Sequence, residues 1–456
     1  MEQIADLHIH SKYSRACSRD LNLENIDRTC CTKGIDIIAT GDFTFPDWFE
    51  GIKNELTPYK NLSVIPAQAG IPVNSNKNQD SRLRGNDRKG SDSALYILKN
   101  AKDEKVKFIL STELALIYKK NDRCRRIHIV VMAPNIESVQ ELNNYLDKKY
   151  NIRSDGRPIL GMSAEELVKL CLSIHPKFLI YPAHIWTPWF AVFGSKSGFD
   201  SMEECFGEYT KDIYAYETGL SSDPEMNWRV SALDKLTLLS NSDAHSLPNL
   251  AREANVFDLK NITYDEIYEV IKYKNTKIQK YKNGSFLNYT IEFYPEEGMY
   301  HFDGHRDCGI SFEPTETKKH KGICPVCKKP LVIGVMNRVE ELADRGASIK
   351  PEGASDFRKL VELDKIIAES LGIKARSSKK VQLEYNNLIN NLGSELNILL
   401  KKDLEDIKKV TTPEIAEGIR RVRNGELNIK PGFDGQYGEI KIFKDEEKES
   451  GQLKLI

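Results

Sequence analysis

Short apolar runs that end in polar residues recur along residues 1–290, and this repetition constrains the fold more than any other feature of the sequence. The runs are rich in β-branched residues, and each is followed by a stretch with the apolar spacing of a helix. Strands that alternate with helices are typical of an α/β sheet or barrel, so we expect that architecture here. The predicted strands are Ile4 to Ile9, Ile35 to Thr40, Phe108 to Leu110, Ile127 to Met132, Phe178 to Tyr181, Ile213 to Tyr216 and Leu236 to Leu239.

The chain has 456 residues, which exceeds the usual size of one compact domain, and its pattern changes along its length. The sequence predicts an α/β barrel over residues 1–290, a metal-binding knuckle over 291–336 and a helical region over 337–456. Residues 64–93 interrupt the barrel with a polar stretch rich in Asn, Ser, Gly and Arg. We interpret this stretch as an inserted, disordered surface loop, because exposed loops tolerate insertions best.

The composition is that of an ordinary globular protein, with 40% hydrophobic and 29% charged residues. The formal net charge of −1 provides no general attraction to a polyanion, so any contact with nucleic acid must come from local patches. The nine cysteines are scattered and do not indicate a disulfide framework. No apolar stretch has the length needed to span a bilayer, and we expect a cytoplasmic protein.

Metal-competent side chains stand at the ends of the predicted strands. His8 and His10 project from one face of the first strand, because side chains alternate along a strand. A single pair of this kind is a weak motif, but carboxylates and imidazoles recur at later strand ends, where barrels carry their chemistry. Such donors suit zinc, manganese, iron or magnesium. We therefore expect two or three divalent metals in the barrel, with ligands drawn from His8, His10, Asp42, Glu113, His128, His184, Asp243 and His245.

A second group of ligands forms a compact motif in the knuckle. His305 and Cys308 make one pair and Cys324 and Cys327 another, with two residues inside each pair and fifteen between the pairs. This spacing is typical of a tetrahedral zinc site, although His301 is an alternative fourth ligand. A closed four-ligand zinc site stabilises a fold without taking part in chemistry.

The strand-end motifs and their order resemble those of the polymerase and histidinol phosphatase (PHP) superfamily of phosphoesterases. The motifs are His-x-His, Thr-Gly-Asp, Pro-Ala-His and Ser-Asp-Ala-His. The resemblance implies a distorted seven-stranded (βα) barrel, and we predict that Asp243, Glu113 and His245 are catalytic. The implied ligands are His8, His10, Glu113 and Asp243 for one ion, and Glu113, His128 and His184 for a second.

A third ion on Asp42 and His245 is left open by this resemblance. Superfamily members commonly have a histidine a few residues after the first motif and another directly after the Asp of the second. Here those neighbourhoods hold Arg15, Ala16 and Phe43 instead. The third ion is therefore either bound by the remaining ligands, or weakly bound or absent.

Side chains beside the predicted ligands are candidates for contact with a substrate. The residues Ser11, Tyr13 and Arg15 follow the His-x-His motif, and an ordinary polar loop explains them equally well. Core packing is the default interpretation of Trp186 and Trp189, which follow His184. Aromatic faces next to a metal site are nevertheless suited to stack a base. Glu217 is expected to contact either a metal ligand or the substrate. The candidates are Ser11, Tyr13, Arg15, Trp186, Trp189 and Glu217.

Over nearly all of its length outside residues 64–93, the chain resembles the endonuclease Q family of DNA repair enzymes. The segments that carry this resemblance include ADLHIHSKYSRA, TGDFTFPDWF, YPAHIWTPWF and GICPVCKKPL. The resemblance implies an endodeoxyribonuclease that turns the damaged nucleotide out of the duplex and cuts on its 5′ side, and we expect a monomer. The implied lesions are uracil, hypoxanthine, xanthine and abasic sites, and residues 337–456 are implied to bind DNA.

Two other functions fit parts of the sequence. A small-molecule phosphomonoesterase of the histidinol phosphatase type would share the barrel and its metals, but it needs neither the knuckle nor the helical region. A non-catalytic DNA-binding scaffold would have lost metal ligands, and most of them are present. The last residues, Gln452 to Ile456, resemble the peptide that binds the replicative sliding clamp, although a frayed terminus explains them more simply.

Overall fold

The computed structural model describes residues 1–60, 93–101, 103–274, 284–347 and 349–444. The predicted inserted loop, apart from Ser93, and the predicted clamp-binding residues Gln452 to Ile456 lie outside the described residues. Within the described ranges, no helix combines the length and the apolar character that crossing a bilayer requires.

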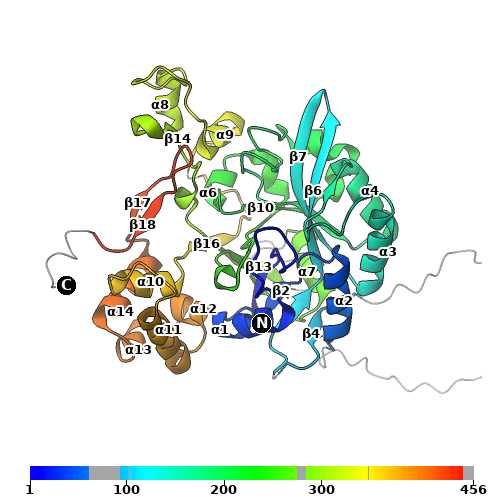
Figure 1. Cartoon of the computed structure of the whole chain (residues 1–456), viewed down its shortest axis with the longest axis horizontal. Coiled ribbons are helices and arrows are strands. Elements are labelled where there is room, and N and C mark those ends of the chain that lie inside the picture. The colour runs from blue at the N-terminus through cyan, green and yellow to red at the C-terminus, as the bar shows by residue number, and fades with distance from the viewer. Residues whose placement is uncertain (61–92, 102, 275–283, 348, 445–456) are drawn as a thin grey trace, which may run out of the picture.

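An eight-stranded mixed sheet forms the centre of the α/β part, in the order β16-β13-β12-β1-β2-β5-β4-β3 (Figure 1). Strands β1, β2 and β5 run parallel, whereas β12 pairs with β1 in the antiparallel direction. The apolar side chains of these strands are buried, as the β-branched runs of the sequence predict. The strands are β1 Glu2–Asp6, β2 Ile37–Ala39, β3 Leu56–Pro58, β4 Tyr96–Leu98, β5 Lys107–Ile109, β12 Ala254–Asp258, β13 Phe286–Glu292 and β16 Asp356–Lys359.

A second sheet has the order β8-β6-β7-β9, and β10 pairs with β11 in a third. The main feature of the second sheet is the long antiparallel hairpin of β6 and β7, which the sequence analysis did not predict as two paired strands. The first of these two strands begins one residue after the predicted strand Phe108 to Leu110. The bounds are β6 Ser111–Lys120, β7 Arg123–Met132, β8 Ile159–Leu160, β9 Leu179–Pro182, β10 Ala215–Glu217 and β11 Thr237–Leu239.

Backbone hydrogen bonds beyond the strands join these sheets at the ends that carry the polar residues. Ala133 N donates to Leu110 O, and Ile185 N donates to Glu217 O. Asp243 N donates to His8 O, which returns the chain to the first strand. The α/β class is therefore confirmed, while the closed seven-stranded barrel stays a prediction because its strands belong to separate hydrogen-bonded sheets.

Helices cover the outer side of the α/β part, where α3 and α4 lie beyond the hairpin of β6 and β7 (Figure 1). Helix α4 begins with a complete capping box, in which Ser163 and Glu166 satisfy each other's backbone groups. The α-helices of this part are α1 Leu23–Lys33, α2 Pro46–Glu55, α3 Ile136–Asp147, α4 Ala164–Ile174, α5 Met202–Phe206, α6 Pro224–Asn227 and α7 Tyr264–Lys272.

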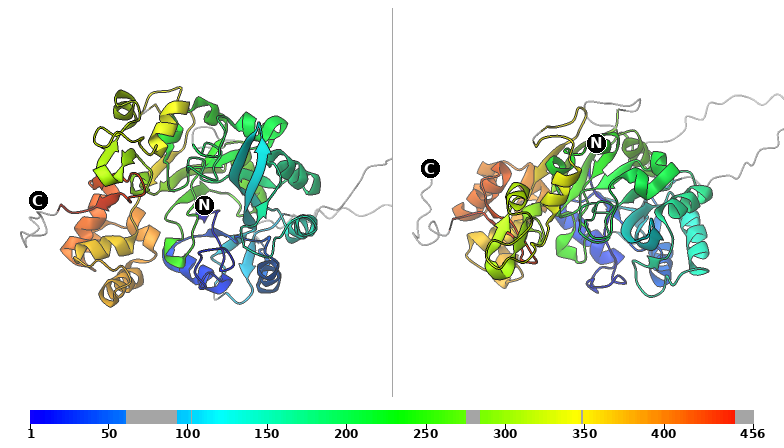
Figure 2. Two further views of the ribbon diagram at one scale, coloured as in Figure 1. Left: turned by 45° about the horizontal axis from the view of Figure 1, so that its top comes forward. Right: turned by 90° about the horizontal axis from the view of Figure 1, so that it is seen from above.

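The rest of the chain lies along one side of the α/β part, with the cysteine-rich segment above a cluster of helices (Figure 1 and Figure 2). Strand β16 comes from the predicted helical region but pairs in parallel with β13 in the large sheet. The proposed division at residues 290 and 336 stays a prediction, and this strand ties the third part to the first. The elements are β14 Asp303–His305, β15 Ile310–Phe312, α8 Pro314–Lys319, α9 Val335–Leu342, α10 Leu363–Ser370, α11 Lys379–Leu392, α12 Glu395–Leu400, α13 Leu404–Lys408, α14 Pro413–Asn424, β17 Asn428–Lys430 and β18 Glu439–Lys441.

One buried arginine anchors the cysteine-rich segment, which is the predicted knuckle at residues 291–336, to the α/β part. Arg338 of α9 donates through Nε to Phe193 O at 3.1 Å and through Nη2 to Phe199 O at 3.0 Å. Its guanidinium also pairs with Asp200 and Glu341 at the surface. These bonds satisfy carbonyl groups that would otherwise be buried without a partner.

We predict that Arg338→Ala lowers the free energy of unfolding by about 3 kcal/mol, because it leaves these buried carbonyls without donors. Arg420→Ala is the matched control, since Arg420 pairs with Glu417 and Glu426 at the surface and its removal should cost less than about 1 kcal/mol. Urea unfolding followed by circular dichroism measures both. Equal effects of the two substitutions would refute the role of Arg338 as an anchor.

Candidate metal centres

The polar ends of distant strands converge on one buried group of ligand atoms. His8 and His10 follow β1, Glu113 lies in β6, and Asp243 follows β11; one ligand atom of each lies within 4.8 Å of all the others. His10 Nε2 is 3.0 Å from Asp243 Oδ1 and 3.3 Å from Glu113 Oε2. Donor atoms around a tetrahedral ion with bonds of about 2.1 Å lie roughly 3.4 Å apart. The spacing in this first cluster is therefore that of a metal site.

An orphaned nitrogen supports this interpretation of the first cluster. His8 is buried, and its Nε2 has no hydrogen-bond partner among the described residues. The same atom is 3.8 Å from both Glu113 Oε2 and Asp243 Oδ1. A buried imidazole lone pair without a donor is costly unless a cation faces it, so the donor set fits a divalent ion.

A second cluster shares Glu113 with the first. Glu113 Oε1 lies 2.8 Å from His128 Nδ1 and 3.2 Å from His184 Nε2, and these two nitrogens are 3.2 Å apart. The first cluster is approached by Oε2 of the same carboxylate. Glu113 is fully buried and faces one cluster with each oxygen, which is the geometry of a carboxylate that bridges two ions.

Buried carboxylates orient the two histidines of the first cluster. His8 Nδ1 donates to Glu217 at 2.9 Å, and His10 Nδ1 donates to Asp42 at 3.1 Å. Each bond places the proton on Nδ1 and leaves Nε2 free to bind a metal. Asn241 Nδ2 in turn donates to Glu217 at 3.0 Å, so Glu217 is itself held in place.

The backbone is bent where the strands deliver their ligands. Asp42, His184 and Asp243 have φ values of 46°, 28° and 45°, in the left-handed region that residues other than glycine rarely occupy. Such strain persists only where the surroundings enforce it, and it is concentrated at functional sites. Here the left-handed conformation turns each of the three side chains back towards the ligand clusters.

Burial and neighbouring charges shift the ionisation of the ligands. Burial disfavours the charged form of Glu113, but His128 and Arg157 outweigh it and hold the pKa of Glu113 well below its usual value. Burial lowers the pKa of His128 to about 4, so at pH 7 this imidazole is neutral and Arg157 is the neighbour of Glu113 that still carries charge. Neutral imidazole and ionised carboxylate are the forms that coordinate metals.

Arg157 is a site residue that the sequence analysis missed. Its Nη1 donates to Glu113 Oε2 at 2.8 Å, and Glu113 raises the pKa of the guanidinium further. The arginine lies in the loop before β8, outside the strand-end pattern that identified the ligands. The only hint in the sequence that this loop enters the site is the preceding Gly156. A Cβ at that position would collide with Asp42 and Ser14, so the close approach of the loop requires glycine.

The third ion, with Asp42 and His245 as its predicted ligands, stays a prediction. Asp42 Oδ1 accepts from His10, and its Oδ2 accepts from Ser11 N, Ser11 Oγ and Ser14 Oγ. Both oxygens are therefore already engaged by protein donors. His245 is partly exposed, 3.5 Å from Asp243, and among the described residues it joins no group of three ligands with Asp42.

The predicted substrate contacts divide between the core and the surface. Trp186 is buried and donates to Asn227, so core packing is the correct interpretation for it. Trp189 is 43% exposed and lies on the loop that follows His184. Glu217 is fully buried against His8, which favours a contact to a metal ligand over a contact to substrate.

The three residues predicted after the His-x-His motif also differ in their exposure to solvent. Ser11 is buried and bound to Asp42, which removes it from direct contact with a ligand in the site. Tyr13 stacks on Phe45 with ring centroids 4.5 Å apart, and Arg15 is exposed. Arg15 is therefore the member of this group that is open to solvent.

The predicted knuckle ligands also come together. One ligand atom from each of His305, Cys308, Cys324 and Cys327 lies within 4.8 Å of the others. Cys324 N donates to Lys329 O and Lys328 N donates to Cys324 O, which closes a tight turn around the second pair. Three sulfurs and one imidazole are the donor set of a structural zinc site.

The alternative knuckle ligand lies elsewhere. His301 is buried outside this group, and its Nδ1 has no hydrogen-bond partner among the described residues. Burial lowers the pKa of His301 to about 4, so the ring is neutral. His305 is thus the histidine that the structure places with the cysteines.

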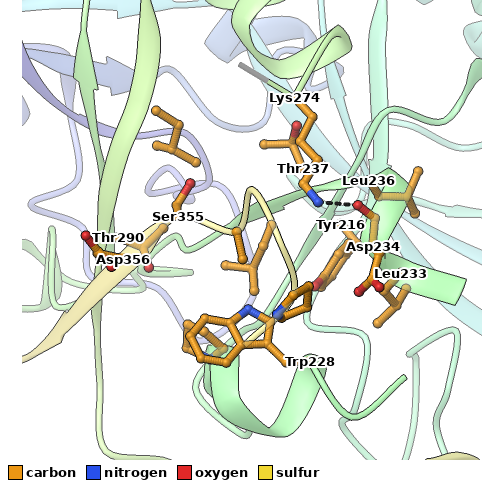
Figure 3. A pocket seen from close by; sticks show the side chains of 15 residues that line it. Tyr216, Trp228, Leu233, Asp234, Leu236, Thr237, Lys274, Thr290, Ser355 and Asp356 are labelled. Carbon is orange, nitrogen blue, oxygen red and sulfur yellow. Dashed lines mark hydrogen bonds between the residues drawn. The ribbon is translucent and has the colours of Figure 1, made fainter. Parts of the chain in front are cut away.

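A separate pocket lies between β10, β11, β13 and residues 351–356 (Figure 3). Tyr216 and Trp228 line it together with Lys274, whose Nζ donates to Asp234 O. Its volume of about 30 Å³ is enough for one water molecule. Its lining includes none of the predicted ligands, so it is not a second candidate for the metal centre.

Similarity to known proteins extends over different parts of the chain. Residues 362–426 match the family model of the MJ0043 C-terminal domain. The chain is 33% identical over 271 residues to the uncharacterized protein MJ0043 of Methanocaldococcus jannaschii, which covers 58% of this chain and 32% of that protein. This chain therefore spans about a third of the length of MJ0043. It is 28% identical to the protein YqxK of Bacillus subtilis, over 69% of this chain and 74% of that protein.

Two solved structures match almost the whole chain. The lesion-specific endonuclease PfuEndoQ from Pyrococcus furiosus has a TM-score of 0.78 and 29% identity, over 99% of both chains. An endonuclease Q in complex with a 27-mer duplex substrate, with an abasic lesion at the active site, has a TM-score of 0.77 and 30% identity, over 98% of both chains. On this similarity of sequence and fold, the chain belongs to the endonuclease Q family.

Proposed function

We propose that this protein is a metal-dependent DNA repair endonuclease that cuts duplex DNA at abasic sites. The observation that carries the proposal is the position of Glu113, whose two oxygens face two separate groups of ligands. A bridging carboxylate holds two cations close together, and paired cations hydrolyse phosphate esters. The similarity over 98% of both chains to an endonuclease Q bound to an abasic duplex supports the choice of substrate.

The proposal includes deaminated bases, cleavage on the 5′ side and a nucleotide turned out of the helix. His8, His10 and Glu113 are buried, whereas Asp243 is partly exposed, so a phosphate reaches the clusters from the side of Asp243. A stacked duplex is too wide to enter such a site, which favours an everted nucleotide. Trp189 offers an exposed aromatic face on the loop that leaves His184.

The residues of the first cluster have separable roles in this reaction. Divalent ions bound in the clusters would supply hydroxide at neutral pH and neutralise the charge that develops on phosphorus. His8 and His10 are held in the correct tautomer by Glu217 and Asp42. Glu113 joins the two clusters and fixes the distance between them.

Two residues at the rim complete the proposal. Arg157 is partly exposed beside Glu113, so its guanidinium is placed to neutralise a phosphate that enters the site. His245 lies beside Asp243 at the surface and can donate a proton to the leaving oxygen. Both groups touch the clusters without being buried in them.

We predict that Asp243→Ala lowers kcat/KM for nicking an abasic duplex by at least about 10³-fold, because a ligand of the reacting centre is removed. The control is Asp122→Ala, which removes a carboxylate that is 97% exposed. End-labelled duplexes with an abasic site, uracil, hypoxanthine or no lesion, incubated with manganese, give the rates. A chromogenic phosphate monoester assayed in parallel tests the histidinol phosphatase alternative. Rapid hydrolysis of the monoester without nicking would reject the proposed function.

Glu217→Gln should weaken the apparent affinity for the activating metal by about 10- to 100-fold, because a neutral amide oxygen accepts the His8 Nδ1 proton more weakly than a carboxylate does. Nicking measured against metal concentration should recover at high metal. Glu203→Gln, at an exposed carboxylate, should leave the metal dependence unchanged. A Glu217 variant whose activity stays low at every metal concentration would show that Glu217 acts otherwise.

The four knuckle ligands are proposed to bind one structural zinc. Cys324→Ser should lower the zinc content of the purified protein by one atom per chain, as measured by mass spectrometry of the metal. Cys171→Ser, at a buried cysteine remote in sequence from the knuckle, should leave the zinc content unchanged. Equal zinc content in the wild type and the Cys324 variant would exclude this site.

A further inference from the structure

The loop between β11 and β12 carries two of the candidate ligands, Asp243 and His245. Asp243 is the one member of the first cluster that is partly exposed. The two strands that the loop connects belong to different sheets, so they do not pair with each other and do not fix the loop between them. The contacts that the loop itself makes therefore decide where Asp243 lies.

The backbone of this loop is left-handed near both of its ends. Asp243 has a φ of 45° and Ala251 a φ of 52°, and such a conformation persists only where the surroundings enforce it. Asp6, at the end of β1, binds the N–H groups on either side of the loop. Its Oδ1 accepts from Ser242 N at 3.1 Å, and its Oδ2 accepts from Ala251 N at 2.9 Å. One buried carboxylate thus joins the two ends of the loop.

Arg252 binds the carbonyl groups of the same turn. Its Nε donates to Ser242 O at 2.9 Å, and its Nη2 donates to Asp243 O at 3.4 Å. These two carbonyls stand directly before and directly after the Cα of Asp243, so one guanidinium spans the backbone of the ligand. Within the part of the chain that the structure describes, the partly buried guanidinium forms no ion pair with an acidic side chain. Its partners are the carbonyls of the loop.

The contact requires the shape of a guanidinium. Nε and Nη2 lie in one rigid plane and reach two acceptors at once, whereas a lysine ammonium is a single centre on a flexible stem. Hydrogen bonds from a charged donor are also stronger than those from a neutral one. Because both acceptors belong to the backbone, Arg252 acts on the position of Asp243 and leaves the Asp243 carboxylate free to face the cluster.

We propose that Arg252 is a positioning residue that fixes Asp243 for the ion of the first cluster. The inference rests on the proposed function and separates the two clusters. The ligands of the second cluster are Glu113 in β6, His128 in β7 and His184 after β9, and none of them lies in the loop that Arg252 holds. Loss of Arg252 should therefore weaken the binding of one ion and leave the other in place.

The test is the number and affinity of manganese ions bound by the protein. Metal-free protein is titrated with Mn²⁺, and the free ion is measured by electron paramagnetic resonance. The wild type should bind two ions per chain. Arg252→Ala should weaken one of them by about 10- to 100-fold, because a group that orients a ligand is removed, and should leave the second unchanged. Methylguanidinium added to this variant should restore the stronger binding, whereas methylammonium should not, because it cannot reach both carbonyls.

Arg423→Ala is the matched control. Arg423 donates through Nε to Leu399 O at 3.0 Å and through Nη2 to Lys402 O at 2.6 Å, so this substitution removes the same kind of bonds within the helical region. Its manganese binding should equal that of the wild type. If Arg252→Ala does not fold, Arg252→Met takes its place, because Met keeps an apolar stem of similar length without the donors.

Three results would overturn the role of Arg252. They are unchanged manganese binding in the Arg252 variant, loss of both ions from it, and an equal change in the Arg423 control. Restoration by methylammonium as well would exclude the two-carbonyl contact as the cause. A wild type that binds two manganese ions but does not nick an abasic duplex would reject the proposed function and leave the role of Arg252 standing.

Discussion

The bridging position of Glu113 is the constraint on which the rest of the site depends. A fully buried carboxylate is expensive unless cations or donors surround it, and Glu113 has His8, His10, His128, His184 and Arg157 within reach. No single strand can supply that environment. The carboxylate, which lies in β6, therefore requires β1, β7, β9 and one loop to meet around it, and the same convergence creates both ligand clusters. The packing of these elements around Glu113 therefore both stabilises this part of the fold and brings the candidate metal ligands together.

The layer behind the ligands explains how the arrangement stays rigid. Asn241 Oδ1 accepts from Leu7 N while its amide donates to Glu217, which in turn accepts from His8 and from His184 N. Backbone and side chain are thus fixed by the same buried network. The left-handed backbone at His184 is stabilised by the bond from its N–H to Glu217, because a strained residue persists only where its neighbours determine its conformation. A site fixed in this way loses little entropy when its ligands bind.

The strand-end pattern was sufficient to predict the α/β class and the residues that meet in the clusters. It succeeded because a strand presents alternate residues on one face, so His8 and His10 had to point the same way. It failed for Arg157, which comes from a loop whose path depends on packing against Asp42, and no local periodicity records that path. Trp186 illustrates an ambiguity that the sequence leaves open, since an aromatic side chain next to a ligand lies in the core as readily as at the mouth, and this one is buried. The pairing of β16 with β13 was also beyond prediction, because it joins segments more than sixty residues apart and depends on tertiary contact.

The positions of the charged side chains say more about the electrostatics of this protein than its net charge does. The buried acidic side chains of the site have local partners that neutralise them, so they add little to the field felt at the surface. The cysteine-rich segment, in which residues 306–329 hold six basic and three acidic side chains, is fixed to the loop that begins at His184. At physiological salt a charge is screened beyond about one Debye length, so the net charge of −1 says little about the field at any one surface of the protein. Because Arg338 and Tyr300 hold the cysteine-rich segment against the loop that begins at His184, its position relative to the metal clusters is determined by the fold and not by the net charge.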